Sequence, residues 1–134
     1  MLLYYFSDKS EMVAATLEHV AHRLGALLSA EGASAPIPID QLTPKLFALL
    51  SAEALWPYMR LWLEIASLAA KNDPVCRTVG EQIARGFLHW GAAQLDSPTP
   101  EAHAVDAAKL LVMIEGMMLL KSVGLDDVCR MALK

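Results

Sequence analysis

Residues 99–124 read TPEAHAVDAAKLLVMIEGMMLLKSVG, and this stretch decides the fold class. Thr99, Pro100 and Glu101 stand in the order of a helix start: an N-cap hydroxyl, a first-turn proline and an acidic residue favoured by the helix dipole. The residues that follow are mostly apolar and contain no strand-like alternation bounded by turn residues. The stretch therefore predicts one long helix that continues to Gly124.

The segments on the N-terminal side repeat this helical pattern. From Lys9 to about Ala30, apolar residues recur at three- and four-residue steps, which is the spacing of one face of a long helix. No segment alternates with a period of two between turn signals, so no strand is expected. The sequence predicts an all-α bundle of about six helices, over 9–30, 40–51, 53–71, 73–95, 99–124 and 125–133.

Capping residues and prolines predict where several of these helices start. Either Asp40 or Thr43 is expected to cap the second helix, with Pro44 in its first turn. Pro57 falls within the third helix and is expected to kink or delay it, because proline removes a backbone hydrogen bond. Asp73 is expected to cap the fourth helix.

The composition limits the class of protein. The chain has 134 residues, of which 55% are hydrophobic and 19% charged, with a formal net charge of -4. This length suits one domain, and the apolar content excludes an intrinsically disordered protein. The apolar residues exceed those of an ordinary soluble domain, so the surplus must lie in a membrane, in a partner interface or around a cavity.

The membrane alternative is disfavoured by the spacing of charges. A spanning helix needs roughly 18 to 20 apolar residues in a row, but Arg60 and Glu64 interrupt the richest window, 55–70, and Glu115 interrupts 110–120. The apolar start of the chain is too short for a signal peptide, so we expect a cytoplasmic protein. The acidic balance, without a run of Lys or Arg, argues against nucleic-acid binding by this chain alone.

Motifs for catalysis and cofactor binding are absent from the sequence. There is no GxSxG, HExxH, P-loop or GxGxxG pattern, so we expect neither an enzyme nor a cofactor. His19 and His22 lie three residues apart on one helix, but no nearby ligand completes a set, so no metal is expected. Cys76 and Cys129 have no CxxC partner and are expected to be reduced, buried thiols.

The large apolar side chains of the inner helices have two interpretations. The chain has three tryptophans and seven methionines, and such residues either fill the core or line an adaptable apolar pocket. On the pocket interpretation the lining residues are Phe47, Trp56, Met59, Trp62, Phe87, Trp90, Met113 and Met117. Polar residues in the same helices must reach the surface, pair with one another or meet a ligand; these are Arg60, Glu64, His89 and Glu115.

The first residues, Leu2-Leu3-Tyr4-Tyr5-Phe6-Ser7-Asp8-Lys9-Ser10-Glu11-Met12, resemble the end of the DNA-reading helix and the start of the linking helix in TetR-type repressors. Later segments resemble the effector-binding and dimerising region of that family more loosely, at 61–64, 72–74, 83–90 and 111–124. The resemblance covers nearly the whole chain. It implies that 1–8 are the remnant of a DNA-recognition helix and 9–134 a ligand-binding and dimerisation domain with the TetR C-terminal fold.

The resemblance also implies partners. Tyr4, Tyr5 and Lys9 match positions that contact DNA phosphates. Because a helix-turn-helix needs a first helix that this chain lacks, we expect operator binding only from a full-length form with the missing N-terminal helices. The last two long helices are implied to pair with their copies in a two-fold homodimer interface, formed by Gly80, Ile83, Ala84, Phe87, Ala104, Ala108, Leu111 and Glu115.

The function implied by the resemblance is that of an effector-binding and homodimerisation domain of a bacterial TetR-like repressor. A small apolar or amphipathic ligand beside the linking helix, 9–30, would shift that helix and change the spacing of two DNA-reading heads. Two alternatives remain open: a stand-alone helical carrier of an apolar metabolite, and a partner that silences full-length regulators by dimerising with them. An enzyme is the least expected class, since no nucleophile or acid–base pair is visible.

Overall fold

The computed structural model describes residues 35–134 and, before them, Glu11, Met12, Ala15, Glu18, His19, His22, Arg23, Gly25, Ala26, Leu27, Ser29 and Ala30. The described residues between 11 and 30 are all helical, as the sequence predicts. Five helices follow in the described part: α2 (Ile39–Ser51), α3 (Trp56–Ala70), α4 (Pro74–Ala93), α5 (Pro100–Ser122) and α6 (Asp126–Ala132). This part of the chain contains no strand, only a single β-bridge between Ile37 and Leu95. The all-α fold is confirmed.

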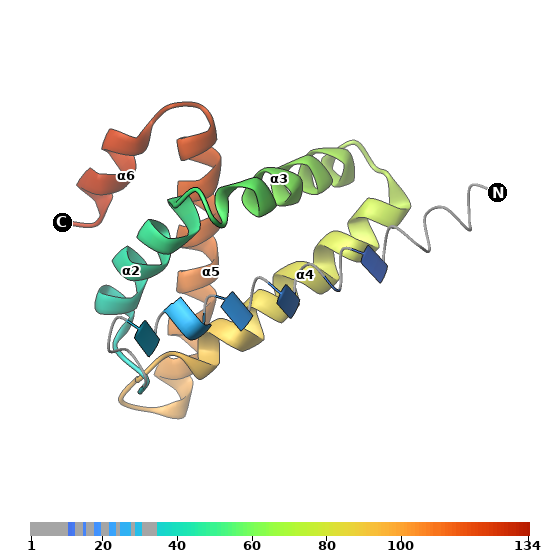
Figure 1. The fold of residues 1–134 in the computed structure, drawn as a ribbon. Coiled ribbons are helices and arrows are strands. Elements are labelled where there is room, and N and C mark those ends of the chain that lie inside the picture. Colours follow the sequence, from blue (N-terminus) through green and yellow to red (C-terminus); the bar gives the residue numbers. More distant parts are fainter. Residues whose placement is uncertain are drawn as a thin grey trace.

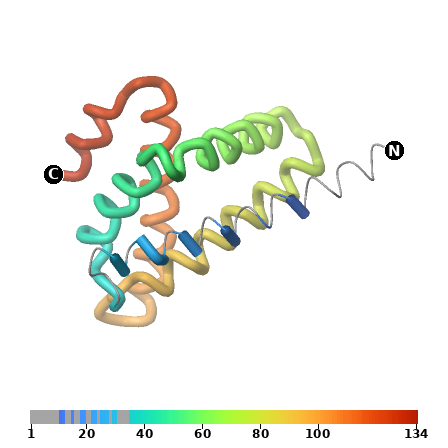
Figure 2. Tube along the Cα trace, viewed as in Figure 1, coloured from blue at the N-terminus to red at the C-terminus, as the bar shows by residue number. Residues whose placement is uncertain are grey.

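Helix α5 connects the other helices of the described part. It contacts α2, α3, α4 and α6. Figure 1 shows α3 and α4 as two arms joined by a short turn, with α5 passing behind them at a steep angle. Helices α2 and α6 lie at the end of the molecule away from that turn (Figure 2). The first helix also contacts the bundle, because Leu27 packs against the core and the His19 ring centroid lies 6.0 Å from that of Tyr58.

The core lies where α2 meets α5. Its side chains are almost completely inaccessible to water, and the largest of them are Leu42, Leu46, Leu50, Leu55, Leu110, Ile114 and Met118. A smaller cluster, built on Ile65 and Val79, holds α3 against α4. Burial of these apolar side chains stabilises the arrangement, at about 1.5–3 kcal/mol for each fully buried Leu, Ile or Met.

The predicted caps of α4 and α5 are confirmed. The Asp73 carboxylate accepts the Cys76 N–H at 2.9 Å at the start of α4. The Thr99 hydroxyl accepts the Ala102 N–H at 3.0 Å at the start of α5. Pro57 delays α3 to Trp56 and lies in its first turn, where a missing N–H has no intrahelical partner to lose.

The predicted start of α2 is wrong. This helix begins at Ile39, its N-cap is Pro38 without a side-chain hydrogen bond, and Pro44 lies inside the helix. The reason is tertiary: Ile37 exchanges backbone hydrogen bonds with Gln94 and Asp96, so the chain is anchored just before the helix and enters it at once. Thr43, now inside α2, is buried and donates its hydroxyl to the Ile39 carbonyl at 2.7 Å.

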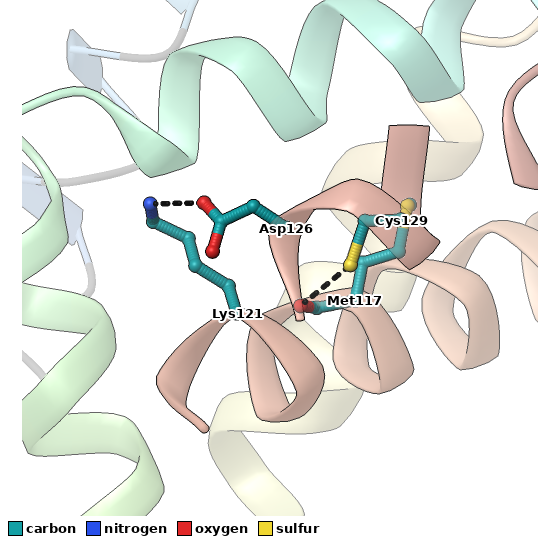
Figure 3. A network of polar contacts seen from close by, with 4 residues as sticks. All are labelled: Met117, Lys121, Asp126 and Cys129. Carbon is teal, nitrogen blue, oxygen red and sulfur yellow. Dashed lines mark hydrogen bonds and ion pairs between the residues drawn. The ribbon is translucent and has the colours of Figure 1, made fainter. Parts of the chain in front are cut away.

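Helix α5 ends in a Schellman motif that positions α6. Gly124 has φ 86°, and the Leu125 N–H donates to the Leu120 carbonyl at 2.9 Å. Helix α6 is then held by side chains shown in Figure 3: Lys121 Nζ lies 3.1 Å from the Asp126 carboxylate and Cys129 Sγ 3.5 Å from the Met117 carbonyl. The hydrogen bond from Lys121 lowers the pKa of Asp126.

The two cysteines differ in burial. Cys129 is a buried free thiol, as predicted. Cys76 is only half-buried, not buried as predicted, because it lies in the first turn of α4 and packs against the edge of the Ile65–Val79 cluster.

None of the described helices is long and apolar enough to cross a membrane.

Candidate functional site

The polar residues of the apolar helices separate into two groups. Arg60, Glu64 and His89 are exposed, so each of them satisfies its charge or hydrogen bonds in water. Glu115, on α5, is half-buried and accepts the indole N–H of Trp62 on α3. Glu115 therefore neither reaches the surface fully nor pairs with another of these polar residues. Its partner is a tryptophan of the neighbouring helix.

The environment of Glu115 changes its protonation. Burial raises the pKa of this carboxyl above its ordinary value, and the hydrogen bond from Trp62 offsets only part of that effect. The cause is that the charged form loses solvation in an apolar surrounding. Carboxyl groups perturbed in this way are concentrated at functional sites. The junction of α3 and α5 therefore holds a carboxyl with a raised pKa and a tryptophan as its hydrogen-bond donor.

An open groove of about 750 Å³ lies next to this junction, between α3 and α4. We call it the α3–α4 groove. Small side chains leave the space, and its lining residues are Trp62, Ala66, Ala69, Ala70, Asn72, Arg77, Thr78, Gly80 and Glu81. The volume falls within the range of about 300–1,000 Å³ that is typical of small-molecule sites.

A second, smaller hollow of about 270 Å³ lies between α4 and α5. We call it the α4–α5 hollow. It has an apolar floor of Ala84, Leu88 and Leu111, with Glu81 and Arg85 at its edge. Glu81 borders both spaces, so the hollow and the groove follow the same side of α4.

The side of α5 opposite the core is apolar and exposed. Val105, Val112, Leu119 and Val123 have exposed fractions of 51%, 71%, 55% and 65%. Ala108 and Gly116 lie between them and are also exposed. We call these six residues the α5 seam. Leu111 of the α4–α5 hollow lies three residues after Ala108 of the seam, and residues three apart are neighbours on a helix surface, so the hollow borders the seam there. A helix that is apolar all round is normally enclosed on all sides.

The residues predicted for a ligand pocket fall into four environments. Phe47 and Met117 are buried in the core, and most of the others pack against it from the edge, namely Trp56, Met59, Phe87 and Trp90. Trp62 alone among them lines the α3–α4 groove. Met113 is exposed on α5 and lines neither of the two hollows.

The residues predicted for a dimer interface are also divided. Ala104 and Ala108 are exposed on α5, and Ala84 and Leu111 line the α4–α5 hollow. The remaining four face inward: Gly80 against Trp62 and Ile65, Ile83 against the Ile65 cluster, Phe87 against Trp90, and Glu115 against Trp62.

The remaining candidate residues are the three predicted DNA contacts and the two histidines of the first helix. Tyr4, Tyr5 and Lys9 lie outside the part of the chain that the structure describes. His19 and His22 are exposed on the first helix. Among the described residues no group of three or more His, Cys, Asp or Glu side chains could hold a metal ion.

The four large residues of the α5 seam are not among the residues predicted from the sequence. The signal that could have found them is the seven-residue spacing of Val105, Val112 and Leu119, which places three apolar residues on one helix face. The alanines of the α3–α4 groove gave no such signal, because small residues also occur in ordinary helix packing.

Comparison of the chain with protein families, with curated proteins and with solved structures gives no significant match.

Proposed function

We propose that the chain is the effector-binding and homodimerisation domain of a TetR-like transcriptional regulator. The observation that carries this proposal is α5, a helix that is apolar on both sides but has only one side in the core. An exposed apolar surface of this kind is typical of a protein interface. The N-terminal resemblance to the linking helix of such regulators supports the same conclusion.

A second copy of this chain suits the α5 seam because the surface is self-complementary. The seam supplies protruding side chains such as Val112, and the α4–α5 hollow beside it supplies a concave apolar floor. In a two-fold dimer each copy can place its protruding residues against the hollow of the other. The charged edge of the hollow is balanced, since Arg85 Nε lies 3.0 Å from Glu81, so the hollow itself brings no unpaired charge to the interface.

A ligand at the α3–α4 groove has a physical connection to this interface. Trp62 lines the groove and donates its indole N–H to Glu115 of α5, and Glu81 borders both the groove and the hollow. A ligand that binds one arrangement of α3, α4 and α5 better than another shifts the population toward it. In the proposed regulator, this shift changes the spacing of the two DNA-reading heads.

The second candidate is a stand-alone helical carrier of a small apolar molecule. It is favoured by one observation: the α3–α4 groove, of about 750 Å³, is lined by α3, α4 and the turn between them and does not involve the α5 seam.

Native mass spectrometry of freshly purified protein tests the proposal and separates it from the carrier. The regulator domain is expected to appear as a dimer at twice the chain mass of 14.6 kDa, with any bound small molecule seen as added mass. A monomer that carries a small molecule would support the carrier and contradict the regulator.

A further inference from the structure

The α3–α4 groove differs in character from one end to the other. Near the α3–α4 turn it is lined by Asn72, Arg77 and Thr78, which are polar, whereas Trp62 and Ala66 line the far end. From Ala70 back to Trp62 the α3 side extends over about 12 Å of helix axis, at about 1.5 Å per residue. A groove with one polar end and one apolar end suits an elongated amphipathic molecule.

We propose that this groove binds a medium-length aliphatic monocarboxylate, with its carboxylate at Arg77 and its chain along the alanines toward Trp62. The assignment deepens the proposed function, on which it rests, by naming the class of effector and the place where it binds.

The charges at the groove favour an anion. Arg77 is exposed and has no ion-pair partner among the described residues. The other ionic residue of the lining, Glu81, is paired with Arg85 at 3.0 Å. The nearby Asp73 carboxylate accepts the Cys76 N–H at 2.9 Å and is not part of the lining. Arg77 is therefore the ionic side chain of the lining that has no ion pair among the described residues, and its N–H groups suit a carboxylate.

A cationic ligand finds no comparable partner. Two half-buried acids lie near the groove, but Asp73 caps α4, Glu115 holds the Trp62 indole, and neither lines the groove. The Thr78 hydroxyl is uncharged and donates to the Pro74 carbonyl at 3.1 Å. The apolar end is equally suited to the chain of either ligand, and the polar end decides between them.

Isothermal titration calorimetry of the full chain with sodium decanoate tests the assignment, with decyltrimethylammonium as a cationic probe of equal chain length. Both probes are kept below their micelle concentrations. We expect decanoate to bind at one site per chain and the ammonium probe to bind at least about tenfold more weakly. Equal affinities, or no binding of decanoate, would overturn the assignment.

Two variants locate the site. Arg77→Gln removes the guanidinium from an exposed position and is expected to weaken decanoate binding about tenfold or more, as for loss of a charge-assisted hydrogen bond. Arg130→Gln, exposed on α6, is the matched control and should change it less than about twofold. Ala70→Glu, also exposed, places an anion in the groove and should reverse the preference toward the ammonium probe. Equal effects of the two arginine variants would overturn the assignment.

The oligomeric state of the same sample separates this assignment from the proposed function. A dimer that binds no decanoate overturns the ligand class and leaves the regulator proposal standing. A monomer that binds decanoate in an Arg77-dependent manner supports the ligand class and overturns the regulator proposal.

Discussion

The replacement Val112→Glu is expected to dissociate the proposed dimer. Val112 is 71% exposed at the middle of the α5 seam. With about 2 kcal/mol for full burial of a valine, covering it in a partner interface contributes about 1.4 kcal/mol per chain and about 3 kcal/mol in a two-fold dimer. Two carboxylates in an apolar interface add a desolvation cost. The dimer dissociation constant should therefore rise at least about a hundredfold, since each 1.4 kcal/mol is a factor of ten.

Sedimentation velocity over a dilution series measures this change, and Met131→Glu is the matched control. Met131 is 70% exposed, on α6 and outside the seam, so the same charge at equal exposure should leave the dissociation constant within about threefold. Far-UV circular dichroism verifies that both variants are folded, as expected for exposed helical positions. If Val112→Glu leaves the dimer intact, or if both variants weaken it equally, the α5 seam is not the interface.

Three further predictions concern the stability of the bundle, each measured by urea unfolding. Because burial raises the pKa of Glu115 in the folded state, the folded chain binds more protons than the unfolded one, and stability should fall as pH rises from about 4.5 through that pKa. Glu115→Gln should lack this decrease and be more stable than the parent at pH 8; parallel pH profiles would contradict the buried position of the carboxyl. Thr99→Ala should lower the free energy of unfolding by about 1 kcal/mol, because it removes the hydroxyl that caps α5. An unchanged urea midpoint would show that this cap does not contribute to stability. Leu46→Ala should cost about 2–5 kcal/mol because Leu46 is fully buried, whereas a loss below 1 kcal/mol would mean that the core repacks around the gap.

The features that the sequence predicts correctly are local ones. Asp73 and Thr99 are identified as caps because the partner of each is the amide three residues ahead. The start of α2 is missed because it depends on backbone hydrogen bonds from Ile37 to a loop near Gln94. A contact between residues so far apart along the chain cannot be inferred from the local sequence pattern. The start of α2 is therefore seen only in the structure.

The candidate site is less accessible to sequence reasoning than the helices are. Glu115 is recognised as a polar residue in need of a partner, but Trp62 lies 53 residues away along the chain. Phe47 and Met117 are predicted to line a pocket but lie in the core. The sequence does not distinguish the two places, because a large apolar side chain fits the same pattern in either. The α3–α4 groove forms where side chains are small. Small residues indicate a groove only when the position of the facing helix is known, and the sequence does not give that position.

The most direct test of the central claim is sedimentation equilibrium of the unmodified chain at low micromolar concentration and above. The exposed α5 seam and the adjoining hollow predict a dimer, with twice the chain mass of 14.6 kDa. A mass of one chain at every concentration would contradict the homodimeric regulator domain.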